Sequence, residues 1–243
     1  ANGSKSIELP FMPYGDNVIS STEGLELQEL PKRLVVIGAG YIGLELGIAY
    51  RKLGSEVTFI EALDTILPIY DTEMTRPISM WLRKHKVTIN LGAKAKGVST
   101  RGKVTTVEYT DSKGQDHKIK ADKVLVTVGR RPNTQGWGLE KMAVDMDGPF
   151  VKVDDQCRTS MKNVWAIGDI VGEPMLAHKA SAQGEMVAEI IAGHRRAFDP
   201  VSIAAVCFTD PEIVGVGLTP DEAKEQDIET VVGKFPFAAS GRA

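Results

Sequence analysis

The sequence predicts an α/β protein with a parallel sheet, and two observations carry this prediction. Residues 34–37 (Leu-Val-Val-Ile) form the continuous β-branched run that is typical of a parallel strand buried on both faces. After a glycine-rich turn, apolar residues recur at helical spacing up to Gly54, a residue type that favours a helix end. Residues 57–60 follow as a second strand, so residues 33–61 have the order and length of a strand–helix–strand unit.

The elements that follow extend this sheet and add an antiparallel hairpin layer. A helix is predicted over residues 71–84, with Asp71 as its cap and Pro77 expected to kink it or to delay its start. The predicted strands here are residues 87–89, residues 104–109 paired as a hairpin with residues 117–120, and residues 124–128, which stop at Gly129. Residues 1–30 are punctuated by prolines and look like a connector.

A different pattern begins at about residue 134. The predicted elements of this second unit are a strand over residues 164–167 and a long helix over residues 177–192. Another pattern starts at residue 204, and its predicted elements are short strands at 207–208 and 213–214, a helix over 221–226 and a last strand near 231–235.

Composition excludes several classes of function. The chain has 243 residues, is 42% hydrophobic and 25% charged, and carries a formal net charge of -3. This charge does not favour a nucleic-acid or membrane partner, and no apolar run approaches the ~20 residues of a membrane span. Cys157 and Cys207 are far apart and form no metal-ligand cluster. We therefore expect two reduced cysteines, no metal site and a cytoplasmic location.

The glycine-rich turn carries the strongest functional signal. Residues 38–43 (Gly-Ala-Gly-Tyr-Ile-Gly) fit G-x-G-x-x-G directly after a strand and at the start of a helix, which is the context of a Rossmann-type dinucleotide site. Gly38 permits the tight turn, Gly40 lets the backbone approach a pyrophosphate, and Gly43 lets the helix pack close to the strand. The helix N-terminus then offers free N–H groups to the phosphates.

Glu61 indicates which dinucleotide binds. It ends the second strand, where an acidic residue accepts hydrogen bonds from the adenosine ribose hydroxyls. A 2′-phosphate would place negative charge against this carboxylate, and the next residues, Ala-Leu-Asp, supply no positive charge. The sequence therefore predicts NAD rather than NADP; the alternative is a glycine-rich turn that binds no ligand.

Four motifs occur in order along the chain: Gly-Ala-Gly-Tyr-Ile-Gly-Leu-Glu-Leu-Gly (38–47), Gly-Arg-Arg-Pro-Asn (129–133), Ala-Ile-Gly-Asp (166–169) and Met-Leu-Ala-His-Lys-Ala (175–180). In this combination they resemble the flavoprotein disulfide reductases, and among these the dihydrolipoamide dehydrogenases (E3 components), especially the bacterial type of branched-chain 2-oxo acid complexes. The similarity runs over essentially the whole chain, to Phe-Pro-Phe-Ala-Ala at 235–239.

The resemblance implies that the chain is the central portion of such an enzyme. The family's FAD-binding N-terminal portion, its redox disulfide and its distal region with a His–Glu base have no counterpart here. Residues 1–4 (Ala-Asn-Gly-Ser) resemble the Ala-Thr-Gly-Ser that closes the missing portion. The implied organisation is a connector (1–30), an NAD-binding Rossmann domain (31–133), a returning segment of an FAD-binding domain (134–200) and the truncated start of an α+β dimer-interface domain (201–243).

The resemblance also implies roles for individual residues. Asp169 would accept a hydrogen bond from a ribitol hydroxyl of FAD, and the helix that starts near Ala177 would direct its N-terminus at the flavin. His178 is interpreted as a packing or capping residue rather than as a base. The implied flavin-side contacts are Met175, Leu176, Ala177 and His178.

Further implied contacts lie around the glycine-rich turn. Tyr41 would either shield the nicotinamide pocket or pack against the loop. Glu45 matches a residue that pairs with a lysine of the missing portion, so we expect an unpaired carboxylate. Gly129 would admit the NAD ribose and Ala95 would contact the adenine through its backbone. The expected cofactor-binding residues are Gly38, Ala39, Gly40, Tyr41, Ile42, Gly43, Leu44, Glu45, Glu61, Ala95, Gly129, Asp169, Met175, Leu176, Ala177 and His178.

These implications give an expected function. The intact protein would be a homodimeric dihydrolipoyl dehydrogenase that uses FAD and NAD and meets the lipoyl domain of a 2-oxo acid dehydrogenase complex. The chain alone is expected to hold no catalytic residue and to be inactive. The alternatives are another pyridine nucleotide-disulfide oxidoreductase, of the mercuric or glutathione type, and a non-catalytic NAD-binding module.

Overall fold

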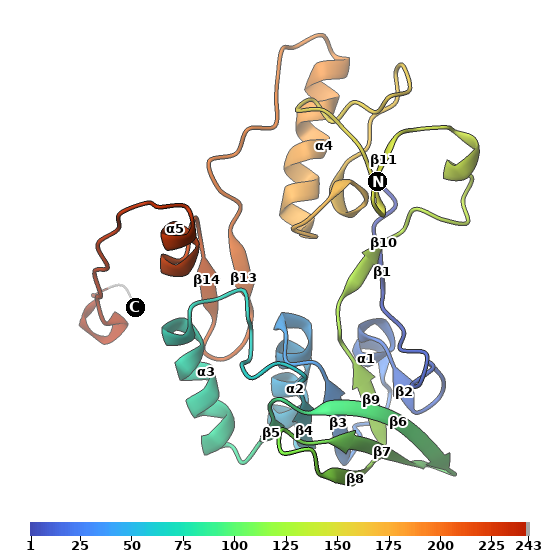
Figure 1. The fold of residues 1–243 in the computed structure, drawn as a ribbon, viewed down its shortest axis with the longest axis vertical. Coiled ribbons are helices and arrows are strands. Elements are labelled where there is room, and N and C mark those ends of the chain that lie inside the picture. The colour runs from blue at the N-terminus through green and yellow to red at the C-terminus, as the bar shows by residue number, and fades with distance from the viewer. Residues whose placement is uncertain (242–243) are drawn as a thin grey trace.

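The computed structural model describes residues 1–241, and a parallel sheet lies in the lower part of the view in Figure 1. Five strands lie in the order β2-β9-β3-β4-β5, and every neighbouring pair is parallel. Their bounds are β2 (Val18–Ile19), β3 (Arg33–Ile37), β4 (Glu56–Ile60), β5 (Thr88–Asn90) and β9 (Lys123–Val126). The predicted strand at 124–128 therefore ends at Val126, before the exposed Val128.

Helices cover one face of this sheet. They are α1 (Ser21–Glu26), α2 (Tyr41–Leu53) and α3 (Thr72–Lys84). Leu34, Val36 and Phe59 belong to the buried cluster that they share with the sheet. The predicted caps are confirmed: Gly54 ends α2 in the left-handed region, at φ 115°, and the Asp71 side chain accepts a hydrogen bond from Glu73 N at the start of α3. Pro77 lies inside α3 and does not delay its start.

A three-stranded antiparallel sheet covers the other face. Its strands are β6 (Lys94–Arg101), β7 (Val104–Thr110) and β8 (Asp116–Ala121), and Val35, Ile37 and Val107 lie in the core between the two sheets. The predicted hairpin corresponds to β7 and β8. The sequence prediction missed β6, which is mostly polar and contains an irregularity between Ala95 and Gly97.

The segment expected to be a connector contributes ordered elements. It supplies the edge strand β2 and helix α1, which has a capping box between Ser20 and Glu23. It also supplies β1 (Ser4–Ser6), which pairs antiparallel with β10 (Arg130–Pro132). In Figure 1 this two-stranded ribbon runs from the Rossmann unit toward the second unit, so the chain enters and leaves the Rossmann unit side by side.

The second unit contains little regular sheet. Its elements are η1 (Leu139–Lys141), β11 (Met146–Asp147), β12 (Phe150–Val151), η2 (Gly168–Val171) and α4 (Ala177–Ile191). The predicted strand at 164–167 is wrong: only an isolated bridge joins Trp165 to Arg158, because the backbone partners of this segment are residues of the adjacent turn. The predicted long helix corresponds to α4.

The C-terminal segment packs beside α2 and α3. It contains β13 (Ala205–Cys207), β14 (Ile213–Gly215), α5 (Pro220–Glu225) and η3 (Phe237–Ala239). The predicted strand near 231–235 is wrong, and Val231 and Phe235 are 97% and 73% exposed. The last two residues of the expected 201–243 unit lie outside the described residues. Within residues 1–241, no helix is both long and apolar enough to cross a membrane.

Candidate dinucleotide site

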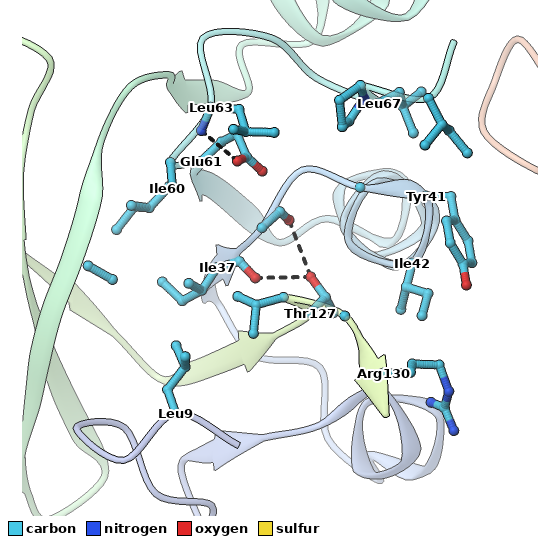
Figure 2. A pocket seen from close by; sticks show the side chains of 18 of the residues that line it. Leu9, Ile37, Tyr41, Ile42, Ile60, Glu61, Leu63, Leu67, Thr127 and Arg130 are labelled. Carbon is cyan, nitrogen blue, oxygen red and sulfur yellow. Dashed lines mark hydrogen bonds between the residues drawn. The ribbon is translucent and has the colours of Figure 1, made fainter. Parts of the chain in front are cut away.

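A pocket of about 620 Å³ lies at the carboxyl ends of β3, β4 and β9 (Figure 2). This is the edge of a parallel sheet at which ligands of α/β proteins bind. The expected residues that line it are Gly38, Gly40, Tyr41, Ile42, Glu61, Ala95, Gly129 and Met175. The pocket therefore brings predicted residues of the Rossmann unit together with Met175 of the second unit.

The three motif glycines have distinct geometric roles. Gly38 has φ 99°, and a Cβ atom there would lie 2.6 Å from the Thr127 carbonyl oxygen. A Cβ atom at Gly43 would clash with the Gly38 carbonyl and lie 2.6 Å from Thr127 Oγ1. By contrast, a Cβ atom at Gly40 would meet nothing within 4 Å. Gly43 is therefore needed for packing, whereas Gly40 keeps the pocket side of the turn open to a ligand.

The N-terminus of α2 supplies an anion-binding surface. Gly40 is its N-cap and has no side chain to satisfy the first turn, and the first helical hydrogen bond runs from Leu44 N to the Gly40 carbonyl. The preceding N–H groups have no acceptor within the helix. Together with the helix dipole they favour a phosphate at this point. Leu44 itself is fully buried in the core and is not part of the pocket wall.

Glu61 is held by two backbone N–H groups at the end of β4. Its Oε2 accepts from Ala39 N at 2.5 Å and its Oε1 accepts from Leu63 N at 2.8 Å. Figure 2 shows the Glu61 side chain at the end of β4, and the residue lines the pocket beside the glycine-rich turn. Each carboxylate oxygen has a second acceptor site, so the group can receive two ribose hydroxyls without moving. Ala39 thus acts through its N–H, while its side chain is buried.

Thr127 is a pocket residue that the sequence prediction missed. Its hydroxyl lies 3.0 Å from the Ile37 carbonyl and 3.2 Å from the Gly38 carbonyl, and it donates its one proton toward this pair (Figure 2). The bond ties β9 to the glycine-rich turn. The available signal was a hydroxyl residue inside the apolar run at 124–128.

The opposite end of the pocket is formed jointly by the Rossmann unit and the second unit. Tyr41 and Arg130 lie there with Glu173 and Met175, which precede α4. Figure 2 shows the Tyr41 ring and the Arg130 side chain on the same side of the turn. Burial raises the pKa of the Tyr41 phenol, so the ring is neutral at physiological pH. An aromatic ring in this place can cover one end of a bound dinucleotide.

Apart from Met175, the flavin-side residues of the prediction lie outside the pocket wall, on η2 and at the start of α4. Asp169 is half-buried and its Oδ2 accepts a hydrogen bond from Ser4 Oγ at 2.5 Å. The N-terminus of α4 has Leu176 as N-cap and no side-chain cap. His178 is exposed, and its Nε2 lies 2.9 Å from the Ala204 carbonyl oxygen. Met175 is the member of this group that reaches the pocket.

The expectation for Glu45 is wrong. Its carboxylate is not unpaired, because Oε1 accepts a hydrogen bond from Phe208 N at 2.8 Å. The bond joins α2 to the start of the C-terminal segment. The prediction considered only the lysine that the resemblance implied, and no sequence pattern indicates a backbone partner 163 residues away.

The described part of the chain contains neither a cluster of metal ligands nor a reactive cysteine. Among residues 1–241, no group of three or more His, Cys, Asp or Glu side chains is arranged to hold a metal ion. Both cysteines are free and buried, and burial raises the pKa of the Cys157 thiol to about 11. The arrangement therefore suits nucleotide binding and not nucleophilic catalysis by these thiols.

Comparison with known proteins agrees with this geometry. Residues 1–184 match the family described as pyridine nucleotide-disulphide oxidoreductase, and residues 203–243 match the dimerisation domain of the same description. The chain belongs to this family. The first match includes the pocket, η2 and the first half of α4, and the second includes β13, β14 and α5.

Within this oxidoreductase family, the chain is similar to proteins named dihydrolipoyl dehydrogenase. The chain is 59% identical over 243 residues to a dihydrolipoyl dehydrogenase of Pseudomonas aeruginosa and 48% identical over 245 residues to one of Bacillus subtilis. Both alignments cover 100% of this chain and 52% of the relative. The chain therefore spans about half the length of the curated relatives that it matches.

Solved oxidoreductase structures have the same fold. The HOCl-induced flavoprotein disulfide reductase RclA of Escherichia coli superposes with a TM-score of 0.89 at 27% identity, over 100% of this chain and 56% of that chain. LpdA of Mycobacterium tuberculosis superposes with a TM-score of 0.82 at 28% identity, over 93% and 49% of the two chains. The mixed α/β fold with parallel and antiparallel sheets is thus the fold of flavoprotein disulfide reductases.

Proposed function

We propose that this chain carries the NAD-binding part of a dihydrolipoyl dehydrogenase. The observation that carries the proposal is the pocket that runs from Glu61 to Met175, because it joins the dinucleotide site to the start of α4. A dinucleotide bound at Glu61 would extend along the glycine-rich turn and place its second ring beside Tyr41. That ring would then face the segment that the family resemblance assigns to the flavin.

The residues present fit NAD. The open space at Gly40 and the uncapped first turn of α2 suit a pyrophosphate, and the Glu61 carboxylate suits unphosphorylated ribose hydroxyls. Ala95 and Gly129 also line this pocket, where Ala95 would contact the adenine and Gly129 would admit the ribose. Among these features, the Glu61 carboxylate is the one that supports NAD over NADP, because the others suit both dinucleotides.

Part of an FAD site also fits. Asp169 presents a half-buried carboxylate for a ribitol hydroxyl, and the uncapped N-terminus of α4 presents backbone N–H groups and a positive dipole end. Bound FAD would supply the two-electron chemistry between a disulfide and a nicotinamide. This chain's residues would bind and orient the two cofactors and exclude water between them.

The net reaction of the proposed enzyme is the oxidation of dihydrolipoamide to lipoamide. The two thiols lose two electrons and two protons, and NAD⁺ accepts two electrons and one proton to give NADH, with one proton released. Its partner would be the lipoyl domain of a 2-oxo acid dehydrogenase complex. The two free buried cysteines suit a reducing cytoplasm.

The proposed organisation follows the same enzyme. Residues 31–133 would form the NAD-binding domain, residues 134–200 the returning segment of the FAD-binding domain, and residues 201–243 the start of the interface domain. The dimerisation-domain match over residues 203–243 supports a homodimer.

Calorimetry with Glu61 variants tests the cofactor assignment. The chain should bind NADH at least about tenfold more tightly than NADPH, which corresponds to ~1.4 kcal/mol. Glu61→Gln should weaken NADH binding and reduce this discrimination, because it removes the charge that opposes a 2′-phosphate. Glu56→Gln, at the exposed start of the same strand, is the matched control and should change neither value.

Assays of the complete protein that carries this sequence test the reaction. We expect NADH formation when dihydrolipoamide and NAD⁺ are supplied together. Reduction of glutathione disulfide or Hg²⁺ by NADPH in place of this reaction would identify another member of the family. Nucleotide binding without turnover of any of these substrates would identify a non-catalytic module.

A further inference from the structure

A chain of hydrogen bonds connects the nucleotide pocket to η2. Arg130, which lines the pocket, donates from Nε to Ser4 Oγ at 2.7 Å. Ser4 Oγ in turn donates to Asp169 Oδ2 at 2.5 Å. The sequence separations are 126 and 165 residues, so the fold alone brings these three side chains together. All three are half-buried.

The direction of these bonds follows from the chemistry of the groups. A guanidinium can only donate and an ionised carboxylate can only accept, whereas a hydroxyl does both. Ser4 therefore links the two charged groups: its hydroxyl accepts from the Arg130 guanidinium and donates to the Asp169 carboxylate. Both bonds involve a charged partner, which makes them shorter and stronger than neutral hydrogen bonds.

Arg130 also clamps the ribbon from which Ser4 projects. Its Nη2 donates to the Ser4 carbonyl at 2.7 Å, and its Nη1 lies 3.4 Å from Ser6 Oγ. These bonds cross between β10 and β1, which connect the Rossmann unit to the second unit. Ser6 contacts Arg130 without contacting Asp169, which makes it a natural control for Ser4.

We infer that Ser4 is a positioning residue that orients the Asp169 carboxylate toward the flavin from the nucleotide side of the molecule. The inference rests on the proposed function, because it takes Asp169 to be an FAD contact. It adds that this contact depends on Ser4 and, through Ser4, on Arg130 at the nicotinamide end of the pocket. The three hydrogen-bonded side chains of Arg130, Ser4 and Asp169 would then set both the orientation of the Asp169 carboxylate and the shape of the nucleotide pocket.

Two energetic consequences distinguish positioning from simple support of the ribbon. If Ser4 acts through Asp169, its loss must have no further effect on FAD once Asp169 can no longer serve as the carboxylate acceptor. In addition, a threonine at position 4 should keep the FAD affinity, because it supplies the same hydroxyl. A residue that only stabilises the ribbon would instead lower stability and FAD affinity together, and so would the loss of Ser6.

The test measures FAD affinity and the flavin absorption spectrum of the complete protein that carries this sequence. The variants are Ser4→Ala, Ser4→Thr, Ser6→Ala, Asp169→Ala and the double variant Ser4→Ala/Asp169→Ala. We expect Ser4→Ala to raise the Kd for FAD about tenfold and to shift the spectrum, whereas Ser4→Thr and Ser6→Ala should stay within about twofold of the unchanged protein. In the Asp169→Ala background, where the Ser4 hydroxyl has no acceptor at position 169, Ser4→Ala should change the Kd by less than about twofold.

The outcomes separate this inference from the proposed function. Equal effects of Ser4→Ala with and without Asp169→Ala, or equal losses in Ser4→Ala and Ser6→Ala, would overturn the positioning role alone. A complete protein that binds no FAD would overturn both the proposed function and the inference. Thermal melting of the FAD-free variants checks that Ser4→Ala retains its fold.

Discussion

Alanine at Gly43 should mainly lower stability, whereas alanine at Gly40 should mainly weaken NADH binding. At Gly43 the added methyl would clash with the Gly38 carbonyl and lie 2.6 Å from Thr127 Oγ1. Both neighbours are fixed, one as backbone and one by its bond to the Ile37 carbonyl. Overpacking of this kind costs about 3 kcal/mol, at the upper end of the usual range. For a protein of this size, the Tm should fall by roughly 6–12 °C.

At Gly40 the same methyl meets nothing within 4 Å in the free protein. The backbone there is extended, with φ −74° and ψ −178°, which alanine adopts without strain. Only a weaker N-cap is expected, at a cost of ~0.5 kcal/mol. The methyl would, however, occupy the space through which a pyrophosphate approaches, so the Kd for NADH should rise at least about tenfold.

Circular dichroism melts and NADH titrations of both variants measure these effects separately. A Gly43→Ala variant that melts with the unchanged chain would show that the helix and the turn can separate without cost. A Gly40→Ala variant that keeps its full NADH affinity would show that the pyrophosphate lies elsewhere, and the proposed pocket would be wrong.

Two further predictions concern pH and local stability. Burial holds the pKa of the Cys157 thiol at about 11, above its ordinary value of 9.0, so the folded state keeps this proton to a higher pH than the unfolded state does. The stabilising contribution of the protonated thiol is fully present below pH 9 and is lost as the pH rises toward 11. Urea unfolding at pH 8–11 should therefore show a smaller loss of stability with pH in Cys157→Ala than in the unchanged chain. Hydrogen exchange should be fastest in residues 201–240, where Phe237 is 83% exposed, and slowest in β3 and β9, where Val36 and Val126 are buried; slow exchange throughout residues 201–240 would contradict the predicted difference in protection.

The central strand–helix–strand unit could be predicted because its local signals agree with its tertiary environment. The run at 34–37 is apolar on both faces, and it lies between helices on one face and β6–β8 on the other. Gly38, Gly43 and Gly54 each stand where a side chain would clash or where φ is positive. A sequence pattern reports such positions directly, since the constraint acts on the residue itself.

Elements that depend on partners elsewhere in the chain were predicted poorly. Residues 164–167 have the composition of a strand, but only one bridge forms because no full neighbouring strand lies beside them. Conversely, β6 is polar and is ordered by its pairing with β7. The bonds of Thr127, Glu45 and Ser4 likewise involve residues far along the chain. Side-chain bonds of this type follow from the fold and leave no periodic signal in the sequence.

The ribbon of β1 and β10 has a consequence for how this architecture can be recombined. Ile7 N donates to the Gly129 carbonyl at 3.1 Å, so the path into the Rossmann unit and the path out of it are one hydrogen bond apart. A stretch of chain with adjacent ends can be inserted into a host, or exchanged for another, without stretching either. Residues 8–128 can therefore be exchanged as one segment for the equivalent part of an NADP-dependent relative between Ile7 and Gly129, provided that its contacts with the C-terminal segment, such as the bond from Phe208 N to Glu45, are kept. We expect such an exchange to change cofactor choice.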